Sequence, residues 1–222
     1  MADPIQAVPL ARPDGRIRML ARLSARDAAA WRRAVRGLVP ALERVLGPEV
    51  LANRTGPGCS GGWRGDLRRA RRLAAALRRS APLLLRTDVR AFYPSVTPSA
   101  LSRALTAAGV PREPAREAMH MLEAWSAGGH AGLPVGPPPS AVLANAVLAP
   151  ADRALRAAGL PFLRWVDDYL IALPWGRPEA ALEPLDEKLA AWGLLRAPEK
   201  TALVDPAEPL RWLGGASRSR NR

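Results

Sequence analysis

The first part of the chain carries apolar residues at helical intervals within an Arg-rich stretch. These residues recur every three or four positions and therefore share one face of a helix. They are Ala28, Trp31, Val35, Leu38 and Leu42. Ser24 and Asp27 precede them at the spacing of a capping box, with Asp in place of Glu. The pattern predicts an amphipathic helix that begins near Ser24.

From Pro82 onward, short apolar runs alternate with amphipathic stretches. The runs at 83–89, 162–166, 169–173 and 201–204 predict strands, and the stretches at 98–109, 112–126, 140–159 and 178–194 predict helices. Pro150 is expected to kink the third of these helices. Pro- and Gly-rich segments at 54–65 and 128–139 predict loops. The order of elements is that of a ferredoxin-like split βαβ sheet, so the expected fold class is α+β.

Asp167 and Asp168 separate two of the predicted strands at the spacing of a hairpin with a two-residue turn. In a split βαβ sheet the strand ending at Asp88 lies beside this hairpin, so the three carboxylates would converge. Carboxylates suit Mg²⁺, and nucleotidyl transfer to a 3′ hydroxyl uses two such ions about 4 Å apart. Ordinary turn chemistry is the alternative. Apolar strands on both sides make unpartnered charges costly, which favours a metal site.

Five segments resemble motifs A to E of reverse transcriptases and occur in the same order. They are TDVRAFYPSV, GLPVGPPPSAVLAN, RWVDDYLIAL, GLLRAPEKTAL and RWLGG. The first is similar to the family's Asp followed by an aromatic pair, and the third to its aromatic-x-Asp-Asp signature. The resemblance implies a fingers-and-palm polymerase. We expect a basic, mostly helical fingers region at 1–80, a palm with part of the fingers at 81–215, and a short basic tail at 216–222 without an encoded thumb.

The resemblance also assigns the chemistry of the site. It implies that Asp88, Asp167 and Asp168 hold two Mg²⁺ ions, with Mn²⁺ as an alternative, and that Val89 takes part in both metal and nucleotide binding. Lys200 corresponds to a lysine near the pyrophosphate that acts as a general acid. A solvated charge at the end of a helix is the alternative for Lys200.

The resemblance implies that nucleotide binding involves aromatic residues after Asp88 and arginines in an upstream fingers strand. Tyr93, with Phe92 before it, stands where the family closes the pocket beneath the sugar, so its ring would reject a ribose 2′ hydroxyl. Without the neighbouring motifs these aromatics would be assigned to the core. PDGRIRML resembles the strand that holds the triphosphate, with Arg16 and Arg18 as its contacts.

The segment GLPVGPPPSAVLAN is expected to lie under the template and the incoming base. Gly136, like Gly132, lets the backbone approach a ligand, and Ser140 would cap a helix that carries Asn145. A proline-rich connector is the alternative. Val135 stands where most replicative members have Gln, so template dependence is open. The Pro-Val-Gly form is similar to that of bacterial defence-type reverse transcriptases, which makes antiviral defence a hypothesis.

Further along the chain, RWLGG resembles the primer grip, in which Trp212 and Leu213 would direct the primer end toward the metals. The Arg-rich stretch at 63–79 predicts a helix that lines the template path or is simply solvated.

Composition agrees with a nucleic-acid partner but does not establish one. The net charge is +13, and Lys occurs only at Lys188 and Lys200. Such an excess attracts phosphate, although an Arg-, Ala- and Pro-rich chain is also typical of a GC-rich genome. One cysteine and two histidines exclude an internal disulfide and a tetrahedral zinc set. No signal peptide or membrane span is expected, which indicates a cytoplasmic protein without a membrane partner.

The sequence therefore predicts an RNA-directed DNA polymerase that binds an RNA template, a DNA product and dNTPs. A partner protein, an RNA or an oligomer would supply the missing thumb. Untemplated or protein-primed DNA synthesis by the same site is one alternative. A non-catalytic RNA-binding module is another, against which three converging acids argue because they repel phosphate.

Overall fold

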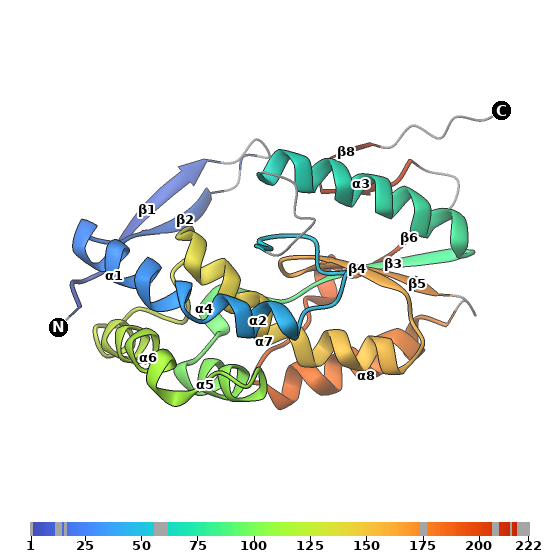
Figure 1. The fold of residues 1–222 in the computed structure, drawn as a ribbon. Coiled ribbons are helices and arrows are strands. Elements are labelled where there is room, and N and C mark those ends of the chain that lie inside the picture. The colour runs from blue at the N-terminus through green and yellow to red at the C-terminus, as the bar shows by residue number, and fades with distance from the viewer. Residues whose placement is uncertain are drawn as a thin grey trace. The chain divides into compact units, whose positions relative to one another are not determined.

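The computed structural model describes residues 2–11, 15, 17–55, 62–173, 177–205, 209–213 and 215–216 (Figure 1). The chain forms two compact units, of which the first comprises Met1–Leu46 and Ala91–Val147 and the second Gly47–Arg90 and Leu148–Arg222. Both helices and strands are present, which is compatible with the expected α+β class. No helix in the described part of the chain is long and apolar enough to cross a membrane.

The first unit contains a hairpin and most of the helices. Strands β1 (Gln6–Ala11) and β2 (Ile17–Arg22) pair antiparallel. The helices are α1 (Ala25–Arg36), α2 (Val39–Arg44), α4 (Phe92–Ser95), α5 (Pro98–Ala107), α6 (Arg112–Ala127) and the first part of α7 (Pro138–Ala157). The predicted cap of α1 is confirmed, because the Ser24 side chain accepts from the Asp27 N–H at 3.1 Å. Trp31 is buried and packs edge-on against Trp125 of α6.

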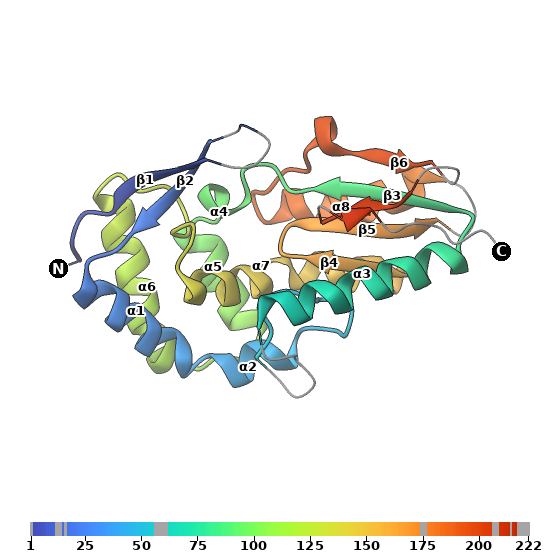
Figure 2. The same ribbon diagram turned by 90° about the horizontal axis from the view of Figure 1, so that it is seen from above.

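The second unit is built on a four-stranded antiparallel sheet. Its order is β4 (Phe162–Trp165), β5 (Asp168–Leu173), β3 (Leu83–Asp88) and β6 (Ala202–Val204). Helix α3 (Trp63–Ser80) lies on one face, and α8 (Pro178–Ala191) on the other (Figure 1, Figure 2). A short 3-10 helix, η1 (Pro198–Lys200), precedes β6. A small hairpin follows it, formed by β7 (Arg211–Trp212) and β8 (Gly215–Ala216). The pairing of β3 with β5 confirms that the strand ending at Asp88 adjoins the hairpin.

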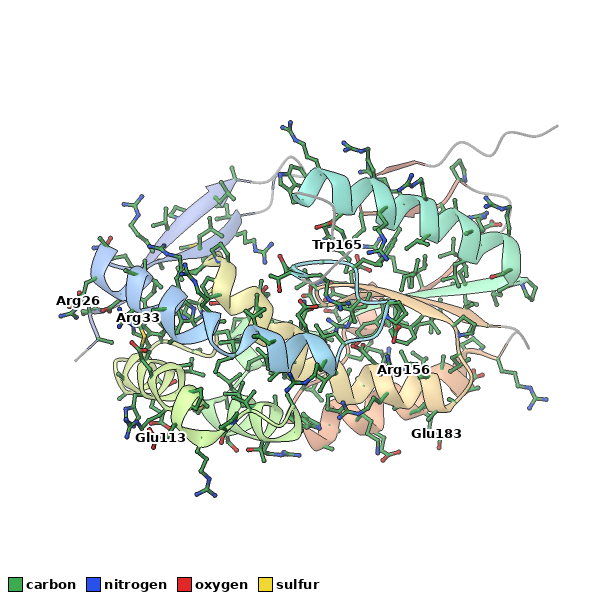
Figure 3. The ribbon with its side chains drawn as sticks, viewed as in Figure 1. Arg26, Arg33, Glu113, Arg156, Trp165 and Glu183 are labelled. Carbon is green, nitrogen blue, oxygen red and sulfur yellow. The ribbon has the colours of Figure 1, made fainter. Side chains whose placement is uncertain are left out.

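Apolar residues from the α3 face of the sheet form a core with the helix. Residues that oppose one another across antiparallel strands point to the same face, so Leu84 and Ala172 join Leu163 and Leu170 there. These side chains pack with Ala70 and Ala74 of α3 and with Trp212 of the small hairpin. Trp165 at the end of β4, labelled in Figure 3, packs partly buried against the same cluster. This packing stabilises the end of the sheet at which the carboxylates lie.

The structure corrects two details of the sequence interpretation. The β4–β5 turn consists of Val166 and Asp167 rather than Asp167 and Asp168, because Asp168 already pairs with Trp165. Helix α7 begins at Pro138, so Ser140 lies inside its first turn and is not its cap. Proline is well tolerated at the start of a helix, which explains the earlier beginning.

Candidate active site

The three predicted carboxylates meet at one end of the sheet of the second unit. Asp88, the last residue of β3, directly opposes Asp168, the first residue of β5. Asp167 lies in the adjoining turn, and its backbone carbonyl accepts a hydrogen bond from the Val89 N–H at 3.2 Å. The antiparallel register therefore brings together acids that are far apart in the sequence.

Each carboxylate has a different electrostatic environment. Asp88 accepts from the Lys200 ammonium at 2.8 Å. Asp168 accepts from the Arg86 guanidinium at 2.9 Å and from the Trp212 indole N–H at 3.0 Å. Arg86 lies two residues before Asp88 on the same face of β3, which places it diagonally opposite Asp168. Two of the three negative charges are thus already paired with protein cations.

Burial and a neighbouring negative charge oppose the ionisation of Asp167. Burial first, and the negative charge of Asp88 second, raise the pKa of Asp167 to about 6. Burial also raises the pKa of Asp168, and the hydrogen bonds from Arg86 and Trp212 oppose that rise. A bound cation would relieve the repulsion between Asp167 and Asp88.

The chemistry of these donors suits a divalent cation. They are oxygen ligands of the kind that Mg²⁺ prefers. One of them, Asp167, is partly buried, and its raised pKa indicates that nearby positive charge does not fully stabilise its ionised form. Among the described residues, no three acidic, His or Cys side chains stand ready to hold a metal ion. The Asp168 carboxylate is instead hydrogen-bonded to Arg86 and Trp212. The three carboxylates therefore fit Mg²⁺ if the Asp168 side chain exchanges its hydrogen bonds with Arg86 and Trp212 for the ion.

A second hydrogen-bonded network holds the segment that carries Lys200. Arg196 forms two hydrogen bonds to Asp186 of α8, at 2.8 and 2.9 Å, and donates to the Thr201 hydroxyl at 3.0 Å. The Thr201 hydroxyl lies 2.7 Å from that of Thr87 in β3. This network ties η1 to the strand that ends at Asp88, and so places the ammonium of Lys200 beside that acid.

Several predicted nucleotide-binding residues lie in the first unit. Phe92 and Tyr93 are buried in α4, with their rings edge-to-face at 5.7 Å. The Tyr93 carbonyl accepts from the Leu133 N–H at 2.9 Å. Gly132, at φ +65°, lies so close to Tyr93 and Pro94 that a Cβ would overlap their backbone. The segment after Asp88 and the Gly-rich loop are therefore packed together.

The same loop also contacts the β1–β2 hairpin. The Val135 carbonyl accepts from the Ala21 N–H at 2.7 Å, and Gly136 adjoins the Leu20 side chain. Arg18 is exposed on β2, whereas Arg16 lies outside the described residues.

The predicted template and primer residues are divided between the units. In the first, Ser140 is buried and accepts from the Trp31 indole N–H at 3.1 Å, and Asn145 is buried in α7. In the second, Trp212 is buried beside Asp168, and Leu213 has a left-handed backbone at φ 57°.

Sequence reasoning missed the polar residues that surround the carboxylates. Arg86 binds Asp168, and Arg164 forms a buried ion pair with Asp152. The available signal was an Arg in each of two apolar strands, since a charge in such a place needs a partner. The sequence does not say which acid that partner is, because helix and strand meet only in the folded chain.

The family comparison agrees with this arrangement. The family model described as reverse transcriptase (RNA-dependent DNA polymerase) matches residues 12–216. The match covers most of the chain, and the chain therefore belongs to the reverse transcriptase family. This membership supports RNA-directed DNA polymerase activity in general, and with it nucleotidyl transfer and the binding of nucleic acid and dNTPs. A comparison with curated proteins gave no match.

Proposed function

We propose that this chain is an RNA-directed DNA polymerase whose chemistry takes place at Asp88, Asp167 and Asp168. The observation that carries the proposal is the β3–β5 register, which sets Asp88 opposite Asp168 with Asp167 in the adjoining turn. The strand order β4-β5-β3-β6 is that of a split βαβ sheet and supports its assignment as the palm. Residues 1–80 would contribute to the fingers and 81–215 to the palm.

In the proposed mechanism, Asp88, Asp167 and Asp168 would hold two Mg²⁺ ions. The bound ions would lower the pKa of the attacking 3′ hydroxyl and neutralise the departing pyrophosphate. Asp88 and Asp167 would bind and orient the ions, and Val89, which donates its N–H to the Asp167 carbonyl, would contribute to metal and nucleotide binding. Arg86 and Trp212 keep the Asp168 carboxylate in place until it is needed as a ligand.

Lys200 would act at the leaving-group side. Its ammonium is 2.8 Å from Asp88, so it neutralises that acid in the absence of other cations. Release from Asp88 would free its proton for the pyrophosphate oxygen. Tyr93 would exclude the ribose 2′ hydroxyl, while Arg18, Val135 and Gly136 belong to the proposed surroundings of the nucleotide.

The test is incorporation of labelled dNTPs by the purified chain with Mg²⁺ and a primed RNA template. Asp167→Asn is expected to reduce kcat by more than about a hundredfold, since loss of a residue behind a metal ligand alone costs about ten- to a hundredfold. Asp205→Asn is a matched control at an exposed position after β6 and should leave kcat unchanged. Equal activity in wild type and Asp167→Asn would refute the assignment.

A second candidate is untemplated synthesis by the same site. Val135 favours it, because a valine side chain offers no hydrogen bond to a template base at the place where Gln is usual. Incorporation that persists without template, yet vanishes in Asp167→Asn, would support this candidate. Antiviral defence is the proposed biological setting, and phage plating on cells with wild-type or Asp167→Asn protein tests it.

A further inference from the structure

The turn that carries Asp167 has an unfavourable backbone. Val166, its first residue, has a φ of 59°, in the left-handed region that β-branched residues rarely adopt. The first position of a two-residue hairpin turn with positive φ there alone is normally filled by glycine. Such a conformation persists only where the surrounding structure imposes it. Something must therefore hold the backbone of Val166 in place.

Arg164 makes the contact that does so. Its side chain is fully buried on β4, and one guanidinium nitrogen donates to the Val166 carbonyl at 2.8 Å. The carbonyl of Val166 belongs to the peptide group that leads into Asp167. A hydrogen bond to that oxygen fixes the orientation of the peptide plane, and with it the direction in which the Asp167 residue leaves the turn.

Asp152 of α7 in turn holds Arg164. Its carboxylate, 1% exposed, accepts from the guanidinium at 2.8 and 2.6 Å. The Tyr169 hydroxyl, also buried, donates to the same carboxylate at 3.0 Å. Burial alone would lower the pKa of Arg164, but the Asp152 charge raises it overall, so the guanidinium stays charged. The cation is rigid because helix and strand fix it from opposite ends.

We propose that Arg164, clamped by Asp152, is a positioning residue that holds the Val166–Asp167 turn in the geometry needed for metal binding. The proposal rests on the proposed function in that Asp167 is a metal ligand. Neither Arg164 nor Asp152 touches the substrate or the metal. The clamp acts only through the backbone of the turn, so its effect should disappear when that backbone no longer needs to be held.

The test replaces both buried charges together, as Arg164→Met with Asp152→Leu. Replacing a whole buried ion pair by apolar residues often leaves stability unchanged. We expect this double variant to fold and to bind Mn²⁺ about ten- to a hundredfold more weakly than wild type. Electron paramagnetic resonance of Mn²⁺ measures the affinity. The kcat for dNTP incorporation should fall by a similar factor, with the KM for dNTP changed little.

Val166→Gly supplies the discriminating variant. Glycine adopts positive φ without cost, so adding it to the double variant should restore most of the Mn²⁺ affinity and of kcat. A role of Arg164 in core packing alone predicts no rescue. Tyr169→Phe is the control, because it removes a hydroxyl from Asp152 without removing the bond to Val166, and it should bind Mn²⁺ like wild type.

Two further measurements keep the result decisive. If the double variant does not fold, Arg164→Lys retains the charge facing Asp152 but cannot serve both the carboxylate and the carbonyl, and the same loss and rescue are expected. Amide hydrogen exchange of residues 166–169 in the metal-free protein should be faster in the variants. Unchanged exchange and Mn²⁺ affinity would overturn the proposal. If the variants change Mn²⁺ affinity and hydrogen exchange as expected, but the wild-type chain incorporates no dNTP, only the polymerase function is refuted.

Discussion

Gly132 occupies a backbone position that no other residue fits without cost. Its φ is +65°, and a Cβ would overlap the backbone of Tyr93 and Pro94. Gly132→Ala should therefore lose about 1–2 kcal/mol for the left-handed conformation and about 1–3 kcal/mol more for the overlap. Chemical denaturation would measure the decrease in the free energy of unfolding.

Gly109 provides the matched control for this substitution. It has a similar φ of +68° but open space where a Cβ would lie. Gly109→Ala should lose only the conformational part, about 1–2 kcal/mol. Equal decreases in the two variants would show that the loop around Gly132 can move away from Tyr93.

His130, just beyond α6, makes the stability of the fold depend on pH. Burial lowers its pKa, against the opposing effect of a backbone hydrogen bond with Leu133, and its Nε2 has no partner among the described residues. The folded chain then binds a proton less readily than the unfolded chain, whose His titrates near 6.5. The contribution of His130 to stability is therefore lost as pH falls through 6.5 toward the lower folded pKa.

The prediction is tested by comparing unfolding free energies at pH 7.5 and pH 5.5. His130→Gln should show a smaller decrease at low pH than wild type. His120→Gln, at an exposed position on α6, should behave as wild type does. Because other groups also titrate in this range, the difference between variants carries the result, and identical decreases in all three proteins would contradict it.

At the scale of elements, a buried hydrogen bond joins α1 to α7. Ser140 was expected to act at the template, and its hydroxyl accepts from the buried Trp31 indole at 3.1 Å. Ser140→Ala should leave that N–H unsatisfied and cost about 1–3 kcal/mol. Thermal unfolding measures the effect beside Ser102→Ala, at an exposed position of α5. A stable Ser140→Ala protein that binds template poorly would instead favour the original expectation.

The helices and strands were predicted well where the apolar residues repeat regularly over the whole element. Helices α5, α6 and α8 and strands β3 to β6 match the expected ranges closely, because their apolar residues repeat at one clear period. Helix α1 begins near Ser24 as expected but ends at Arg36, so Leu42 lies in the separate helix α2. Strand β1 was missed, since QAVPLA has no apolar alternation and includes Pro9, which is acceptable in a two-stranded hairpin.

The prediction of the site depended on motifs rather than on periodicity. Motif residues such as Asp88 and Asp168 were named from the sequence, and the β3–β5 register brings these two together. Their partners were not found. Arg86 and the pair Arg164–Asp152 act through contacts between elements, which a single sequence does not encode in any local pattern. The predicted position of the β4–β5 turn was wrong by one residue, because ordinary turn preferences do not place a valine at positive φ.

At the scale of the whole molecule, part of the net charge of +13 lies on α3, which is a candidate surface for binding nucleic-acid phosphates. Its exposed positions repeat along one side of the helix and include Arg64, Arg68, Arg72 and Arg79, with the exposed Trp63 at its start. If this side binds phosphates, removing one phosphate-binding Arg should reduce the slope of log K against log salt by about 0.7–0.9.

Fluorescence anisotropy with a labelled RNA–DNA duplex tests this surface over a range of salt concentrations. Arg68→Gln with Arg72→Gln should weaken binding and lower the slope by up to about 1.4–1.8, the amount expected for two phosphates. Arg112→Gln with Arg116→Gln, on exposed positions of α6, is a control of equal charge change. An equal change in both pairs would mean that only net charge matters.

The Arg164–Asp152 pair also bears on how the hairpin finds its register during folding. Side chains alternate between sheet faces, so a slip of one residue between β4 and β5 would carry Arg164 to the α3 face. Asp152 would then be left buried without its cation, at a cost of about 3–5 kcal/mol. Apolar strands alone discriminate weakly between such registers when both faces are covered. A single buried ion pair thus selects the one β4–β5 alignment in which Trp165 opposes Asp168, with Val166 and Asp167 in the turn.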